Sequence, residues 1–73
     1  MIGDIKRLLA GEPFVPFTIH LTDGGVVRVP TLDHAIVFPS ATRLMVTHDD
    51  DTWDLIPGFQ ISRVTVDSTP QVA

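Results

Sequence analysis

The chain has 73 residues, no cysteine and a formal net charge of −4, and 44% of its residues are hydrophobic. This length suffices for one hydrophobic core, so we expect a single domain over residues 1–67 and a frayed tail over residues 68–73. The missing cysteines exclude disulfides and thiolate zinc sites, and the acidic balance disfavours binding to nucleic acid or to an anionic membrane. No segment has the ~20 consecutive apolar residues of a membrane span, and none has the pattern of a signal peptide, so we expect a cytoplasmic protein.

Residues 2–10 have the spacing of a short amphipathic helix. Ile2, Ile5 and Leu9 recur at helical intervals, which places an apolar stripe along one side. We expect Gly11 to end the helix in a left-handed conformation, because glycine adopts it at little steric cost. A helix this short is not stable alone, so it must dock on the rest of the domain.

The remainder of the chain has the pattern of short strands separated by turns. After an extended connector that contains Pro13 and Pro16, apolar and polar residues alternate from Phe17 onward with the period of a half-buried strand. An aspartate and two glycines at residues 23–25 give a strong hairpin signal. The predicted strands cover residues 17–22, 26–29, 35–38, 43–48, 52–56 and 61–66, with a tight, 3₁₀-like turn at residues 57–60.

This spacing of strands and turns predicts the fold class. Short strands joined by turn signals every 8–12 residues or so are typical of a small barrel or sandwich. We predict a mainly β protein, in which a short N-terminal helix precedes a five- to six-stranded antiparallel barrel of the SH3-like or Sm-like kind. The run at residues 35–38 has no polar side chain, so we expect this strand to be covered on both faces.

The opening of the first strand carries a family resemblance. Residues 13–24 read PFVPFTIHLTDG, which resembles the PFxPFxIxLxDG opening of a group of short bacterial proteins. The resemblance continues through Val29 and Pro30 to the closing ISRV at residues 61–64 and covers the chain from Leu9 to about Val66. It implies no activity.

A looser similarity, in layout only, links the chain to Sm-like proteins. In those proteins a helix precedes a strongly bent five-stranded barrel, and subunits join edge to edge into rings that bind RNA. Here Asp33 is followed by HAIV, whereas Sm-like proteins place small and polar residues, often asparagine, after the acidic position. The late basic residues are also missing, apart from Arg63. The similarity therefore supports a barrel more than it supports RNA binding.

Residues suited to catalysis or metal binding are few and scattered. The serines occupy no recognisable nucleophile elbow, and nothing in the sequence brings Asp23, Asp33 and Asp54 together, so we expect no enzyme and no cofactor. The histidines lack the spacing of a local chelate, and we interpret residues 49–51, three adjacent aspartates, as a solvated hairpin tip. We predict no metal site; its weak candidates are His20, His34, His48 and Asp49.

The preferred functional hypothesis is a non-enzymatic, self-associating protein–protein interaction module. A high hydrophobic content without disulfides indicates a chain that gains from burying a face or sheet edge, most simply in a homo-oligomer. We expect Trp53, together with Leu55, to pack into the core or against a neighbouring subunit. The alternatives are an Sm-like RNA-binding ring that gathers arginines, and a metal-dependent protein that uses histidine and aspartate. The candidate binding residues are Trp53, Phe38, Ile36, Arg28, Arg43 and Arg63.

Overall fold

The computed structural model describes residues 1–68, which form one α-helix, two 3₁₀ helices and six strands. In chain order these are α1 (Ile2–Ala10), β1 (Phe17–Leu21), β2 (Val26–Val29), η1 (Leu32–His34), β3 (Ala35–Val37), β4 (Arg43–Thr47), β5 (Trp53–Pro57), η2 (Gly58–Gln60) and β6 (Ile61–Val66). The predicted helix is confirmed, and each predicted strand is present with its ends shifted by at most one residue. Of the tail predicted to fray, residues 69–73 lie outside the described residues.

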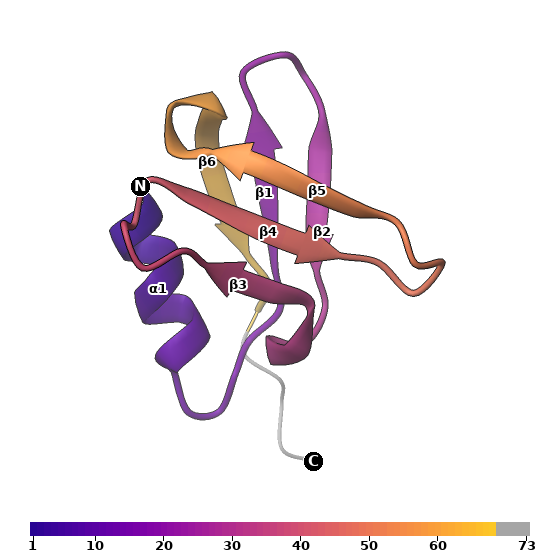
Figure 1. The fold of residues 1–73 in the computed structure, drawn as a ribbon. Coiled ribbons are helices and arrows are strands. Elements are labelled where there is room, and N and C mark those ends of the chain that lie inside the picture. The colour runs from indigo at the N-terminus through magenta and orange to yellow at the C-terminus, as the bar shows by residue number, and fades with distance from the viewer. Residues whose placement is uncertain (69–73) are drawn as a thin grey trace.

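The strands of residues 1–68 form two antiparallel sheets of three strands each. The first sheet has the order β2-β1-β6 and the second sheet the order β3-β4-β5. In Figure 1 the second sheet lies in front of the first and its strands cross those behind at a steep angle, with α1 to one side. The chain changes sheet at η1 and again at η2. The mainly β, antiparallel class is thus confirmed, and the described residues form two separate sheets rather than a closed barrel.

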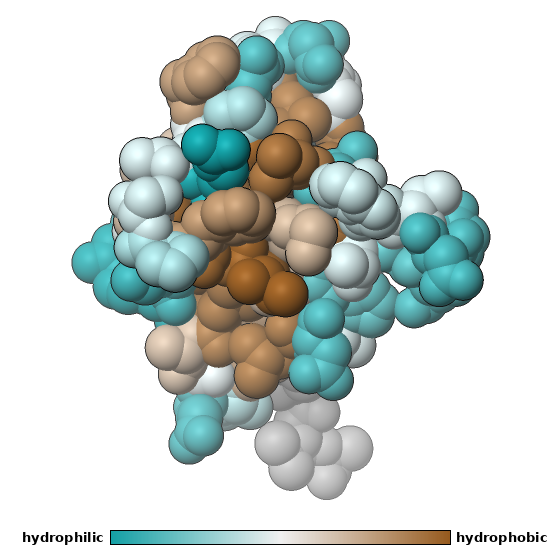
Figure 2. Space-filling view, viewed as in Figure 1, coloured by the Kyte–Doolittle hydropathy of each residue, from teal (hydrophilic) through white to brown (hydrophobic). Residues whose placement is uncertain are grey.

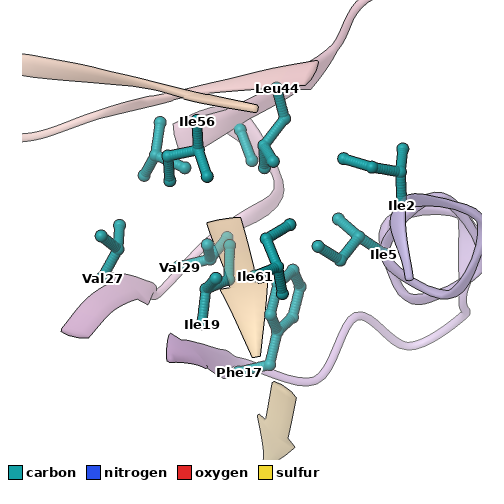
Figure 3. Packing of buried hydrophobic residues seen from close by; sticks show 11 residues of the cluster. Ile2, Ile5, Phe17, Ile19, Val27, Val29, Leu44, Ile56 and Ile61 are labelled. Carbon is teal, nitrogen blue, oxygen red and sulfur yellow. The ribbon is translucent and has the colours of Figure 1, made fainter. Parts of the chain in front are cut away.

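One hydrophobic core lies between the two sheets and α1, and every strand contributes to it (Figure 3). The alternation of apolar and polar residues places every second side chain in the core. Phe17 and Ile19 of β1 are fully buried, while Thr18 between them lies on the other side of the strand. Burying one such side chain contributes about 1.5–3 kcal/mol, so the shared core is what joins the sheets. The core consists of Ile2, Ile5, Phe17, Ile19, Val27, Val29, Ala35, Leu44, Val46, Ile56 and Ile61.

Two local predictions are wrong. Gly11 is extended, with φ −67° and ψ 146°, and its N–H donates to the carbonyl of Leu8. The helix ends this way because the chain then bends at Glu12 and Pro13 before it runs on to β1. The strand at residues 35–37 is covered on one face only, since the side chain of Ile36 is 54% exposed. Its apolar run reflects an uncovered outer face rather than a second layer of core.

The helices were also compared with the length and apolar character of a membrane span. Among residues 1–68, no helix combines the length and the apolar character needed to cross a bilayer.

Candidate functional site

The outer face of the second sheet, turned away from the core, is built from three cross-strand rows. The pairing register places Ile36 of β3, Met45 of β4 and Leu55 of β5 side by side in the middle row. At one end, Arg43 pairs with Pro57, and the N–H of Phe38 donates to the carbonyl of Arg43. The row at the other end is Thr47 with Trp53, and the neighbouring segment contributes His34.

The middle row is apolar and open to solvent. Ile36 is 54% exposed and Leu55 is 45% exposed, with the half-buried Met45 between them. In Figure 2 a brown, hydrophobic patch spreads across this face over β3, β4 and β5, with hydrophilic residues of the β4–β5 hairpin beside it. Residues that alternate correctly along a strand normally leave the outward face polar. This sheet does not follow that rule, so its outer face has the character of an interface.

The cationic end of this face is formed by Arg43. Its guanidinium lies 5.7 Å from the centroid of the Phe38 ring, within range of a cation–π contact. Among residues 1–68 no carboxylate forms a salt bridge with it. Beside it a cavity of about 370 Å³ is lined by Arg43, Leu55, Pro57, the 80% exposed Phe59 and Thr42. This end thus combines a positive charge with exposed apolar groups.

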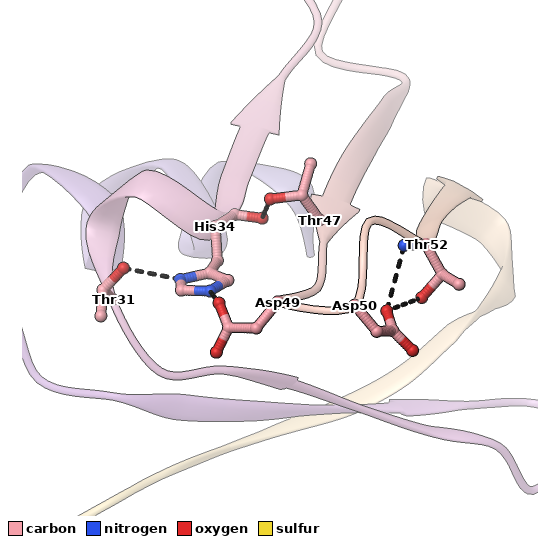
Figure 4. A network of polar contacts seen from close by, with 6 residues as sticks. All are labelled: Thr31, His34, Thr47, Asp49, Asp50 and Thr52. Carbon is pink, nitrogen blue, oxygen red and sulfur yellow. Dashed lines mark hydrogen bonds and ion pairs between the residues drawn. The ribbon is translucent and has the colours of Figure 1, made fainter.

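The opposite end of the face is acidic. Trp53 is 59% exposed there, so the prediction that it packs into the core is wrong. The Nε2 atom of His34 lies 2.9 Å from a carboxylate oxygen of Asp49, whose side chain is 94% exposed (Figure 4). The Nδ1 atom of the same ring is 2.7 Å from the hydroxyl of Thr31. His34 therefore connects the segment before β3 to the tip of the β4–β5 hairpin.

The hairpin tip itself, residues 49–51, is held by a compact turn. The hydroxyl and the N–H of Thr52 donate to the same carboxylate oxygen of Asp50, at 2.5 and 3.0 Å. These hydrogen bonds, the one from the hydroxyl foremost, hold the pKa of Asp50 below its usual range. Asp50 is therefore ionised at neutral pH. We call residues 49–51 the acidic tip.

The outer face of the first sheet is polar by contrast. His20 contacts the hydroxyl of Thr65 at 3.0 Å, and Arg28 donates to Thr18 at 3.0 Å. Arg28 also forms a two-pronged salt bridge with Asp67, one hydrogen bond of which measures 2.7 Å. The hydrogen bonding of this pair raises the pKa of Arg28 and lowers the pKa of Asp67. The polar groups of this face largely satisfy one another.

The structure separates the six candidate binding residues into two groups. Four of them lie on or beside the outer face of the second sheet, whereas the other two lie on strands of the first sheet. Of the three arginines, Arg28 and Arg63 thus belong to one sheet and Arg43 to the other. The first group is Trp53, Phe38, Ile36 and Arg43, and the second is Arg28 and Arg63.

The histidines also lie apart from one another. His34 meets Asp49, while Nε2 of His48 lies 2.7 Å from a carboxylate oxygen of Asp54, and His20 is on the first sheet. Within residues 1–68 no group of three or more histidine, cysteine, aspartate or glutamate side chains is placed to hold a metal. A structural or catalytic zinc site uses at least three protein ligands.

Sequence reasoning missed some residues that the fold brings together. Met45 and Phe59 lie at the outer face of the second sheet. The outward position of Met45 could have been predicted from the alternation of β4, because its neighbours Leu44 and Val46 are the buried residues of that strand. Asp23 and Asp54, from different sheets, line one cavity of about 270 Å³. Asp54 is already bonded to His48, and Asp23 accepts a hydrogen bond from the N–H of Gly25, so both carboxylates of this cavity have partners.

Comparison of the chain with protein-family models, with curated proteins and with solved structures gives no match.

Proposed function

We propose that this protein is a self-associating protein–protein interaction module that binds through the outer face of the second sheet. The main support is the row formed by Ile36, Met45 and Leu55, an apolar surface that continues across three strands. Exposed apolar groups arranged contiguously, rather than singly, mark interaction sites on soluble proteins. The exposed Trp53 at the end of this surface is of the residue type that most often anchors an interface.

We also propose that the two sheets are the halves of an SH3-like or Sm-like barrel. The chain passes from one sheet to the other at η1 and at η2, and a single core fills the space between the sheets. In this arrangement the core side is already occupied, so an interacting partner has access only to outer faces and edges. The outer face of the second sheet is the more apolar of the two.

The size of this surface sets the expected affinity. Three strands about 4.8 Å apart, two with five residues and one with three, each residue rising ~3.3 Å, present a face of at most roughly 14 by 17 Å. Stable complexes bury about 800 Å² on each partner, and this face is smaller even with its flanking aromatic residues. We therefore expect dissociation constants in the micromolar range or weaker, on the order of 10–500 μM.

Sedimentation velocity of the full chain across this concentration range tests the proposal. Wild-type protein should sediment faster as its concentration rises, and Leu55→Lys should weaken association at least about tenfold, because it loses apolar burial and places a charge in the interface. Val26→Lys is the matched control, since Val26 is a 63% exposed residue on the first sheet. It should associate like the wild type.

The folding of both variants is checked by urea denaturation under monomeric conditions. Both side chains point to solvent, so the free energy of unfolding should change by no more than about 0.5 kcal/mol. A wild-type chain that remains monomeric at about 1 mM, beyond the upper end of this affinity range, rules out the proposed function. Equal weakening by the two variants also contradicts it.

A further inference from the structure

Charge is distributed unevenly along β4 and the hairpin that follows it. Arg43 begins the strand, forms no salt bridge among residues 1–68, and lies at one end of the outer face of the second sheet. Asp49 lies beyond the other end, and its side chain is 94% exposed. Between them lie the apolar row of Ile36, Met45 and Leu55 and the mixed row of Thr47 and Trp53. The face is therefore cationic at one end, apolar in the middle and acidic at the other end.

From this distribution we infer that the partner at this face is a second copy of the chain, packed face to face with its strands antiparallel. The inference rests on the proposed function and adds to it the orientation of the two copies. The twofold axis lies midway between the second sheets of the two copies. It is perpendicular to the strands and passes over β4 near Val46. Each Arg43 then faces Asp49 of the partner subunit, and the pair occurs twice.

The dimensions of the strand fit this orientation. Residues 43 and 49 are separated by six steps, four of them within β4 and the last two in the hairpin, so they lie at most ~20 Å apart, with Val46 as their midpoint in sequence. An axis at this point places the middle row of one copy over the Thr47–Trp53 row of the other, so that Trp53 lies over Leu55 of the partner subunit and Met45 lies over Thr47 of the partner subunit. Packed sheets keep their strands within about 30° of one another, an offset that the length of an arginine side chain accommodates.

Charge excludes the opposite orientation. With the strands parallel, the two Arg43 guanidinium groups would face each other, and so would the two acidic tips. Within the tip, the hydrogen bonds from Thr52 hold the pKa of Asp50 below its usual range. Like charges placed together at an interface suppress that geometry, and complementary charges fix the register.

Charge-swap variants test the orientation. Arg43→Glu brings two acidic side chains together at both contacts of its own dimer, and Asp49→Lys brings two basic side chains together at both contacts of its dimer. Each variant alone should dimerise about tenfold more weakly than the wild type. In a mixture of the two, both contacts are complementary, so the heterodimer should form with near wild-type affinity. One chain carrying a fluorescent label at its N-terminus lets sedimentation distinguish the heterodimer from the homodimers.

The controls separate orientation from other effects. Arg63→Glu makes the same charge change on the first sheet and should leave dimerisation unchanged, and Asp49→Asn removes the charge while retaining a hydrogen-bond acceptor near His34. Higher salt should reduce the preference for the heterodimer. If the wild type dimerises but the mixture shows no such preference, the orientation is wrong and the interaction face stands. If the wild type is monomeric throughout, the proposed function fails and the orientation fails with it.

Discussion

The two sheets share one core but differ in what they expose to solvent. On the first sheet, outward side chains bond one another: His20 contacts Thr65, and Arg28 bridges Thr18 and Asp67. On the second sheet, the middle of the outer face is apolar, with Ile36 and Leu55 about half exposed. Alternation of strand residues therefore gives the first sheet a mostly polar outer face, whereas it leaves the second sheet with apolar side chains exposed to solvent.

The turns of the two sheets differ as well. The β1–β2 hairpin uses a glycine for its positive backbone angle, Gly24 at φ 89°. The second sheet places non-glycine residues in this region at both of its turns, Ala41 at φ 57° and Asp51 at φ 69°. A side chain in this conformation costs roughly 1–2 kcal/mol for most residues. Aspartate tolerates this conformation better than alanine, so the second sheet carries both the uncovered face and a strained turn at Ala41.

The largest expected effect on the free energy of unfolding comes from substituting neighbouring residues on the two faces of β4. Leu44 is fully buried and its neighbour Met45 points outward. Leu44→Ala should lower the free energy of unfolding by about 2–5 kcal/mol because it leaves a cavity in the core. Met45→Ala should change it by less than about 1 kcal/mol in the monomer. Urea denaturation at low protein concentration measures both, and equal losses would mean that the outer face of the second sheet is also covered within the monomer.

Sequence patterns predicted the positions of the strands well because alternation is local. The order apolar, polar, apolar at Phe17, Thr18 and Ile19 indicates which side chains are buried, and no other strand is needed to recognise it. The helix and the hairpin at Gly24 were likewise predictable from spacing and from one glycine. The end of the helix at Gly11 was not, because that depends on the direction in which the chain leaves for the next strand.

The candidate site was predictable only in part. Trp53 and Ile36 were identified as binding residues, but apolar side chains in a strand give the same pattern whether they face a core or a partner. Residue type cannot distinguish burial within a chain from burial between chains. The contact of His34 with Asp49 depends on the β3–β4 register, which brings together residues 15 positions apart and has no local signal.

Substitutions in the turns should have an intermediate effect on the free energy of unfolding. Gly24→Ala should lower the free energy of unfolding by about 1–2 kcal/mol, because alanine is strained at a positive φ. Ala41→Gly should raise it by about 0.5 kcal/mol, since the relief of strain exceeds the greater chain entropy of unfolded glycine. Thermal unfolding of the two variants beside the wild type measures the opposite signs.

Gly3→Ala controls for the glycine change itself. Gly3 lies in α1, and an added Cβ there meets no atom within 4 Å, so alanine should stabilise the helix by up to about 1 kcal/mol. Destabilisation by Ala41→Gly would show that the strain at this turn is compensated by contacts of the alanine methyl group.

The smallest expected effect is a dependence of stability on pH. Hydrogen bonds are its main cause in both sheets, from a charged donor in the first sheet and from an uncharged donor in the second. Arg28 lowers the pKa of Asp67 on the first sheet, and Thr52 lowers the pKa of Asp50 on the second. A carboxyl whose pKa is lower in the folded chain stabilises it above the ordinary pKa of about 4. That contribution is lost as the pH falls through the lower, folded value. Stability should therefore decrease below about pH 4.

Asp67→Asn removes the contribution of the first sheet, and Thr52→Ala removes the hydroxyl's part of the contribution of the second while the backbone N–H still donates to Asp50. Titration of the side-chain carboxyl carbons by NMR should show the pKa of Asp50 returning toward its ordinary value in Thr52→Ala, with Asp67 unaffected. Salt then distinguishes the charged donor, Arg28, from the uncharged donor, Thr52. It screens the charge of Arg28 and should raise the pKa of Asp67, whereas the hydrogen bonds from the uncharged Thr52 should keep the pKa of Asp50 low. Equal responses to salt would mean that the acidic tip, too, is governed by neighbouring charges, and its fixed turn would then not explain why Asp50 stays ionised beside two other aspartates.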